Sequence, residues 1–126
     1  MEAETYYYKK HVYSADPYAP EVDYAFGNVG PAYELMQGHC EFDISGNLKD
    51  WDSTDDLHKI NIPALCIHGN DDESTPYINK VMYDRIPDCQ WEIIQYGTHL
   101  CHFEYPEKFN SRVAKFLDYA EEKYKG

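Results

Sequence analysis

Two short segments of this chain end in side chains that could carry out acid–base chemistry. Asp72 and Glu73 follow the apolar run 62–68, and His99 follows the run 91–96. If both runs are neighbouring parallel strands, their carboxyl ends lie about 4.8 Å apart, and open parallel sheets bind ligands beyond such ends. Asp72 and His99 would then be within hydrogen-bond reach. A carboxylate that orients an imidazole stabilises the imidazolium formed during proton transfer, so the pattern predicts the Asp–His half of a catalytic triad.

The elements around these residues alternate as in a parallel sheet. The run 62–68 is apolar almost throughout and ends in a turn, which predicts a strand buried on both faces. Pro76 begins a helix to about Arg85, 91–96 is the next strand, and Pro106 begins the last helix. The order strand, helix, strand, helix predicts an α/β fold with a right-handed βαβ unit. In the first helix the apolar residues that share one face are Ile78, Val81, Met82 and Ile86. In the last helix one buried face is expected, formed by Phe109, Val113, Phe116, Leu117, Ala120 and Tyr124.

The chain changes character near residue 42. Before it, a short helix is expected over Tyr6–Tyr13 and helical patterning follows Pro20, interrupted at Gly30-Pro31. After it come the two expected strands and their helices. Two parallel strands leave sheet edges open, so the pattern itself indicates that a larger sheet is missing.

Composition narrows the class of protein. The 126 residues carry a formal net charge of -12, which disfavours nucleic acid and anionic membranes as partners. There is no apolar run of about 18 residues and no visible signal peptide. The four cysteines form no CxxC pair, so we expect reduced thiols and a cytoplasmic protein, and we expect no cofactor.

Five stretches in register resemble proline iminopeptidases (prolyl aminopeptidases) of the α/β-hydrolase fold, over about Tyr6 to Phe116. Leu48-Lys49-Asp50-Trp51-Asp52 and Asp72-Glu73-Ser74-Thr75-Pro76 are the most specific of the matching pieces. The others are Tyr7–His11 with Asp16-Pro17, Tyr33–Phe42, and His99 with Glu104, Pro106, Glu107 and Phe109. The resemblance implies a partial α/β-hydrolase fold, with residues 1–42 a remnant of the helical cap domain and 43–126 the C-terminal part of the core.

The same resemblance implies a role for each site residue. Asp72 would be the triad acid and His99 the general base, and Glu41 and Glu73 would hold the free α-amino group of a peptide or amino-acid amide substrate. An ammonium group favours several charged acceptors, which suits this role. The family's activity would be release of an N-terminal residue by acyl transfer to a serine.

The sequence departs from the family pattern at two places. His39-Cys40 replaces a pair of small residues at the rim of the expected pocket. No serine stands in G-x-S-x-G, and no cysteine stands in G-x-C-x-G. In α/β-hydrolases the nucleophile precedes the acid and the histidine, so we expect the nucleophile in a missing N-terminal hydrolase portion and an inactive isolated chain.

Simpler interpretations stay open for each residue. Asp72 could serve only as a turn residue, with Asp71 competing for the acid role, and His99 could be a surface histidine. Glu41 and Glu73 could be ordinary solvated carboxylates. A metal site at His99, His102 and Glu104 is disfavoured because the spacing lacks the HExxH pattern. Two alternative functions remain: a non-catalytic interaction module derived from an α/β-hydrolase, and a hydrolase that uses Cys101 as its nucleophile.

Overall fold

The computed structural model describes residues 2–125, which form two compact units. The first unit joins the residues up to Asp16 to those from Asp56 onward, and the second is Pro17–Asp55. These boundaries differ from the expected segments 1–42 and 43–126, and the assignment of 1–42 to a cap stays a prediction. The units are described separately below.

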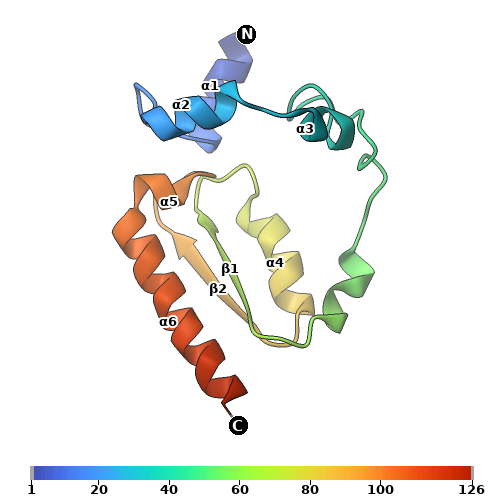
Figure 1. Ribbon diagram of the computed structural model, residues 1–126, viewed down its shortest axis with the longest axis vertical. Coiled ribbons are helices and arrows are strands. Elements are labelled where there is room, and N and C mark those ends of the chain that lie inside the picture. The colour runs from blue at the N-terminus through green and yellow to red at the C-terminus, as the bar shows by residue number, and fades with distance from the viewer. Residues whose placement is uncertain (1, 126) are drawn as a thin grey trace. The chain divides into compact units, whose positions relative to one another are not determined.

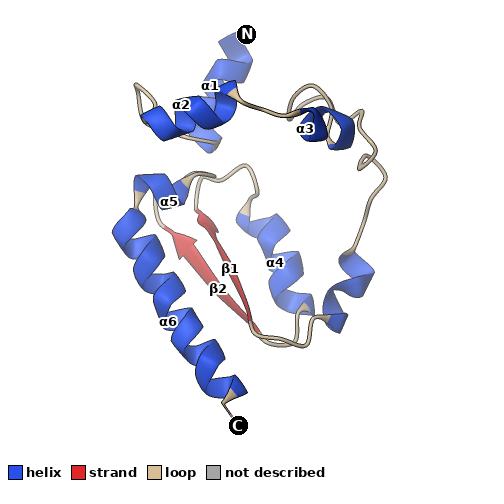
Figure 2. Ribbon diagram, in the orientation of Figure 1, coloured by secondary structure: helices blue, strands red, loops and turns tan. Residues whose placement is uncertain are grey.

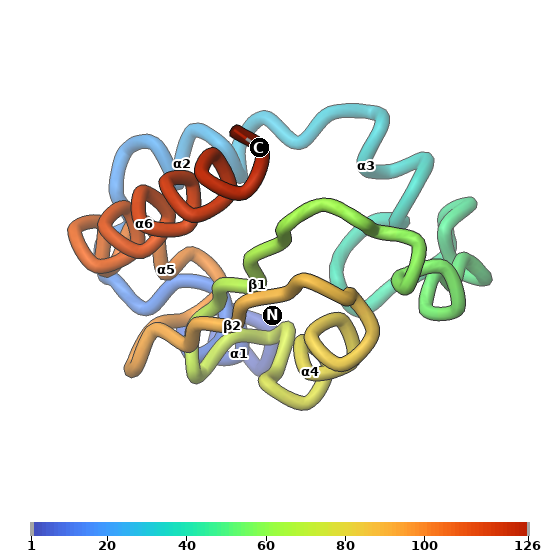
Figure 3. Tube along the Cα trace, turned by 90° about the horizontal axis from the view of Figure 1, so that it is seen from below, coloured from blue at the N-terminus to red at the C-terminus, as the bar shows by residue number. Residues whose placement is uncertain are grey.

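A two-stranded parallel sheet forms the centre of the first unit. Strand β1 (Ala64–Gly69) pairs with β2 (Cys89–Ile94), in a register that runs from Ala64 opposite Cys89 to Gly69 opposite Ile94. Helix α4 (Pro76–Arg85) connects the strands, and α6 (Pro106–Tyr124) follows them (Figure 1). Figure 3 shows α4 and α6 on opposite sides of the sheet. The expected order and the parallel pairing are confirmed.

Local sequence signals explain where α4 begins and ends. Pro76 occupies the first turn, where a missing N–H costs nothing, and the Thr75 side chain accepts from the backbone N–H of Ile78. The helix ends at Arg85, two residues before Pro87. The apolar face of this helix is only partly covered, because Ile86 is buried whereas Ile78 is 51% exposed. Asn79 is buried instead, where its amide donates to the carbonyl oxygen of Ser74 at 2.6 Å.

The second strand and the segment after it differ from expectation. β2 begins and ends two residues earlier than the predicted 91–96. It begins early because Cys89 already pairs with Ala64, and it ends early because the chain turns at Tyr96, which has a φ of 65°. The left-handed conformation is uncommon for a residue with a side chain and gives no sequence signal. A short helix, α5 (Cys101–Glu104), follows the turn and was not expected.

Burial is lower than a complete sheet would give. The prediction that 62–68 is buried on both faces was wrong, because in β1 only His68 and Gly69 are fully buried. None of the described residues of α6 is fully buried, and Leu117 on its expected inward stripe is 54% exposed. Two strands provide too little surface to cover both helices and both sheet faces.

The remaining elements are helical (Figure 2). In the first unit, α1 (Glu2–His11) overlaps the helix expected over Tyr6–Tyr13, but it begins four residues earlier and ends two residues earlier. The second unit contains α2 (Pro20–Gly27) and α3 (Pro31–Met36), each with a proline in its first turn, as the break at Gly30-Pro31 predicted. A short 3-10 helix spans Thr54–Lys59.

At Gly69, the last residue of β1, the backbone lies very close to the loop that follows β2. A Cβ atom at Gly69 would lie 2.1 Å from the carbonyl oxygen of Gly97 and 2.4 Å from that of Thr98. Both obstacles are backbone atoms, so no side chain can rotate to make room. The acid-bearing loop and the histidine-bearing loop can therefore meet only if residue 69 is glycine.

We predict that Gly69→Ala destabilises the protein. The overpacking should lower the free energy of unfolding by about 1–3 kcal/mol, measured by urea unfolding followed by circular dichroism. Gly27→Ala is the matched control, because a Cβ there meets no atom within 4 Å, and it should be neutral or stabilising. Equal stability of the two variants would contradict the role given to Gly69.

Candidate active site

Two loops leave the same end of the sheet and are held to each other by backbone hydrogen bonds. The N–H of Asn70, after β1, donates to the carbonyl of Ile94 at 3.0 Å, and the N–H of Asp71 donates to the carbonyl of Gly97 at 2.9 Å. We call residues 70–75 the acid loop and 95–100 the histidine loop. The parallel register thus continues past the strands and brings the two loops into contact.

The expected contact between Asp72 and His99 is confirmed. His99 Nδ1 lies 2.9 Å from Asp72 Oδ1, which also accepts from the backbone N–H of Ser74 at 2.7 Å. An ionised carboxylate only accepts hydrogen bonds, so beside Asp72 the proton of the ring lies on Nδ1 and Nε2 is the basic nitrogen. The Asp72 side chain is 4% exposed, whereas that of His99 is 47% exposed. A buried orienting acid and an accessible base are the arrangement needed for general base catalysis.

Glu73 lies on the other side of the same imidazole. Its Oε1 is 3.9 Å from His99 Nε2, and its side chain is 18% exposed. The acid loop therefore places one carboxylate against each ring nitrogen. Asp72 is the nearer of the two carboxylates, at 2.9 Å from Nδ1, and Glu73 is the farther, at 3.9 Å from Nε2.

Glu41 belongs to the second unit. There its Oε1 accepts a hydrogen bond from the Tyr33 hydroxyl at 2.6 Å, and its side chain is half-buried. Asp71, the competitor for the acid role, has a different partner, because its carboxylate accepts from the Asn70 amide at 3.2 Å. The contact with His99 distinguishes Asp72 from its neighbour.

His68 is buried and has both ring nitrogens engaged. Nδ1 lies 2.7 Å from the carbonyl oxygen of Gly69, and Nε2 accepts from the Trp91 indole at 2.9 Å. A histidine bonded in this way is neutral and structural. Within residues 2–125 no group of three or more His, Cys, Asp or Glu side chains is arranged to bind a metal ion. No helix in the described part of the chain is long and apolar enough to cross a membrane.

Cys101 is poorly suited to act as a nucleophile. The side chain is 2% exposed. Burial, and then the negative charges of Asp72 and Glu104, raise the pKa of its thiol to about 11. The thiolate is the reactive form, and it is scarce at neutral pH with such a pKa.

The structure also reveals a contact between the N-terminal segment and both loops that no sequence pattern predicts. The carbonyl oxygen of His11, at the end of α1, accepts from the N–H of His99 at 3.0 Å and from the N–H of Glu73 at 3.3 Å. One peptide group thus bonds to both loops. It lies about sixty to ninety residues away along the chain, so no local pattern indicates the contact.

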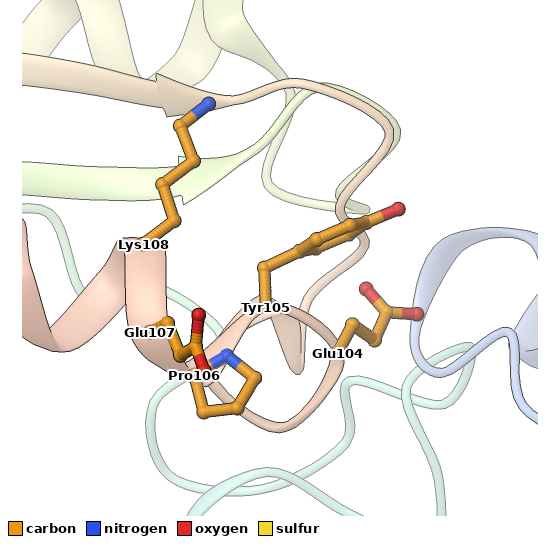
Figure 4. A pocket seen from close by; sticks show the side chains of 5 residues that line it. All are labelled: Glu104, Tyr105, Pro106, Glu107 and Lys108. Atoms are coloured by element: carbon orange, nitrogen blue, oxygen red, sulfur yellow. The ribbon is translucent and has the colours of Figure 1, made fainter.

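A surface hollow of about 420 Å³ lies at the junction of α5 and α6 and is lined by Glu104, Tyr105, Pro106, Glu107 and Lys108 (Figure 4). Neither Asp72 nor His99 lines it. The hollow is therefore distinct from the candidate active site.

Comparisons with known proteins identify the relatives of this chain. Proline iminopeptidase of Lactobacillus acidophilus is 37% identical over 87 residues, covering 69% of this chain and 30% of that enzyme. Proline iminopeptidase of Thermoplasma volcanium is 29% identical over 120 residues, covering 94% and 41%. The chain is a homologue of the C-terminal portion of proline iminopeptidases. The resemblance found in the sequence is confirmed.

Solved structures agree with this relationship. The crystal structure of proline iminopeptidase from Mycobacterium smegmatis matches with a TM-score of 0.89 and 31% identity, covering 94% of this chain and 41% of that one. The fold is thus part of an α/β-hydrolase fold, as expected. The chain spans 30% to 41% of the length of these relatives. No protein-family model matches the chain.

We predict that Asp72, and not Asp71, fixes the tautomer of His99. In Asp72→Asn the amide can donate to Nδ1, so the proton should move to Nε2. Nitrogen NMR of the ring, assigned with a His99→Gln variant, measures the tautomer directly. Asp71→Asn, which changes the charge equally one residue away, should leave the Nδ1–H form in place. The reverse result would assign the acid to Asp71.

We predict that Cys101 resists alkylation in the folded chain. With a pKa of about 11, only about one thiol in a thousand is ionised at pH 8, and the side chain is buried. Iodoacetamide labelling followed by peptide mass spectrometry should show Cys101 modified only after unfolding in urea. Rapid labelling of Cys101 in the native chain would restore the cysteine-nucleophile alternative.

Proposed function

We propose that this chain supplies the acid, the base and the amino-group carboxylates of a serine aminopeptidase of the proline iminopeptidase kind. The observation that carries the proposal is the Asp72–His99 hydrogen bond at the carboxyl ends of two parallel strands. Homology to proline iminopeptidases supports the reaction class. The substrate would be a peptide or amino-acid amide with a free N-terminus.

The mechanism follows from the tautomer. With its proton on Nδ1 held by Asp72, His99 accepts the proton of a serine hydroxyl at Nε2 as the serine attacks the scissile carbonyl. Asp72 stabilises the imidazolium, which then protonates the leaving amine. Water attacks the acyl-enzyme in the second half of the reaction, with His99 again the base, and the free N-terminal residue is released.

The α-amino group of the substrate would be bound by Glu73 and Glu41. Glu73 supports this role by its position beside Nε2, the atom next to the reacting carbonyl. A carboxylate near that point favours a substrate whose ammonium nitrogen lies two bonds from the carbonyl carbon, on the same Cα, which restricts cleavage to N-terminal residues. Glu41 enters the proposal by its match to the family pattern.

The serine nucleophile is proposed to come from a hydrolase portion outside these 126 residues. No serine in the sequence stands in G-x-S-x-G, and the relatives are more than twice as long. A cytoplasmic location is part of the same proposal and is supported by four cysteines without a CxxC pair.

A non-catalytic interaction module is the second candidate. It is favoured by the two-stranded sheet, whose strand β1 has a paired neighbour on only one side among the described residues. Unpaired strand edges are templates for pairing with another chain. This candidate predicts that residues 72 and 99 have no effect on any activity in which the chain takes part.

The test compares the chain alone with the chain combined with the complementary N-terminal portion of the Lactobacillus acidophilus enzyme, joined or co-expressed. We expect no hydrolysis of prolyl or alanyl arylamides by the chain alone and hydrolysis by the combination. His99→Ala and Asp72→Asn should each lower kcat about 10⁴-fold, and Asp71→Asn should not. Glu73→Gln should chiefly raise KM for substrates with a free amine.

Two results would contradict the proposal. One is hydrolysis by the pure chain that His99→Ala abolishes, because it would place the nucleophile inside the chain. The other is an active combination that tolerates both His99→Ala and Asp72→Asn, which would leave the interaction module as the better account.

A further inference from the structure

Three successive backbone N–H groups of the histidine loop donate to fixed acceptors. The N–H of Thr98 donates to Glu104 Oε2 at 2.7 Å. Those of His99 and Leu100 donate to the carbonyls of His11 and Val12, at 3.0 and 2.9 Å. The backbone N–H groups of residues 98–100 are thus all hydrogen-bonded. Two of their three acceptors are carbonyl oxygens of the N-terminal segment.

Glu104 joins that segment to the histidine loop. Its Oε1 accepts from the backbone N–H of Ser14 at 3.0 Å and from the Ser14 hydroxyl at 2.5 Å, while Oε2 holds Thr98. An ionised carboxylate suits this position because it offers acceptors only, on both oxygens. Hydrogen bonds to a charged acceptor are about twice as strong as neutral ones. Figure 4 shows the carboxylate pointing away from Lys108.

Thr98 also links the segment His11–Ser14 to the histidine loop through its side chain. Its side chain is buried, and its hydroxyl lies 2.7 Å from the carbonyl of Val12 and 3.0 Å from Glu104 Oε1. The Val12 carbonyl also accepts from the N–H of Leu100, so loss of the Thr98 hydroxyl removes one of its two donors at a buried position. Thr98 is also the residue directly before His99, so any shift of its backbone moves the imidazole.

We propose that Glu104 is a positioning residue that sets the orientation of His99 toward Asp72, acting through Thr98 and the segment His11–Ser14. Its meaning for catalysis rests on the function proposed above. Glu104 acts through its hydrogen bonds to Ser14 and Thr98, which hold the N-terminal segment against the histidine loop. When it is lost, the loop keeps its carbonyl partners but loses the bond that fastens Ser14 and Thr98 to each other.

The test compares Glu104→Gln with Glu107→Gln in the 126-residue chain. Gln removes the same charge in both, but Glu107 is exposed in the first turn of α6. A glutamine at 104 has one acceptor oxygen, and its amide hydrogens face the N–H donors. Loss of a charge-assisted bond corresponds to a roughly tenfold shift toward the released loop.

Two measurements follow that shift. Amide hydrogen exchange at His99 should accelerate about tenfold in Glu104→Gln and remain unchanged in Glu107→Gln. The Nδ1–H fraction of His99, by nitrogen NMR, should fall in Glu104→Gln at temperatures well below unfolding. A residue with a merely structural role would lower stability without changing the tautomer of the folded protein.

If Glu104→Gln fails to fold, variants of Thr98 test the positioning role instead. Thr98→Ser keeps the hydroxyl and should retain the Nδ1–H form, whereas the isosteric Thr98→Val should lose it. An unchanged His99 tautomer in folded Glu104→Gln, or in Thr98→Val if the former does not fold, overturns the positioning role.

The outcome is separable from that of the proposed function. If Asp72→Asn changes the tautomer and Glu104→Gln does not, only the positioning role of Glu104 fails. If Asp72→Asn also leaves it unchanged, the Asp–His pair itself fails.

Discussion

The carbonyl oxygen of Gly97 occupies the space where residue 69 would carry a side chain. The closeness of these two backbones determines much of the first unit. It allows the parallel register of β1 and β2 to continue into the loops, so that Asp71 bonds to Gly97 and Asp72 reaches His99. A loop displaced by the width of one methyl group would separate the carboxylate from the imidazole. The chemistry of the site therefore depends on a position that has no functional group.

In the first unit, the buried polar groups of the site have hydrogen-bond partners, whereas much of the apolar surface of the helices is not buried. Asp72, His68 and Thr98 are each buried with bonded partners. The faces of α4 and α6 are only partly covered by two strands. This contrast is expected for the end of a larger sheet, because hydrogen bonds at the strand ends are made locally, whereas burial of a sheet face requires several neighbouring strands.

The sequence predicted those features that depend on neighbouring residues. The bounds of α4 and the start of α6 were predicted because prolines define them, and the Asp72–His99 contact because parallel strands end at one edge. The end of β2 was misplaced because a left-handed Tyr96 has no sequence signature. The burial of β1 was overestimated because that inference assumed neighbouring strands that residues 2–125 do not form.

The contacts of the N-terminal segment His11–Ser14 with the two loops could not be predicted. The links from His11, Val12 and Ser14 to the two loops involve side chains and peptide groups of common types, with no spacing that reveals them. In the sequence, Glu104 stood out as part of the family pattern that follows His99 and as a member of the disfavoured metal cluster, and its bonds to Ser14 and Thr98 became apparent from the structure.

Those long-range links also bear on the order of folding. Val12 and Thr98 are 86 residues apart, and Ser14 and Glu104 are 90 apart. Closing so long a loop costs entropy that local contacts do not recover, so such pairings form late. On the ribosome, the segment His11–Ser14 emerges well before the loop that it holds. The imidazole can therefore acquire its final orientation only after the chain has been synthesised as far as Glu104, because the bonds that hold the histidine loop join segments on both sides of this long stretch.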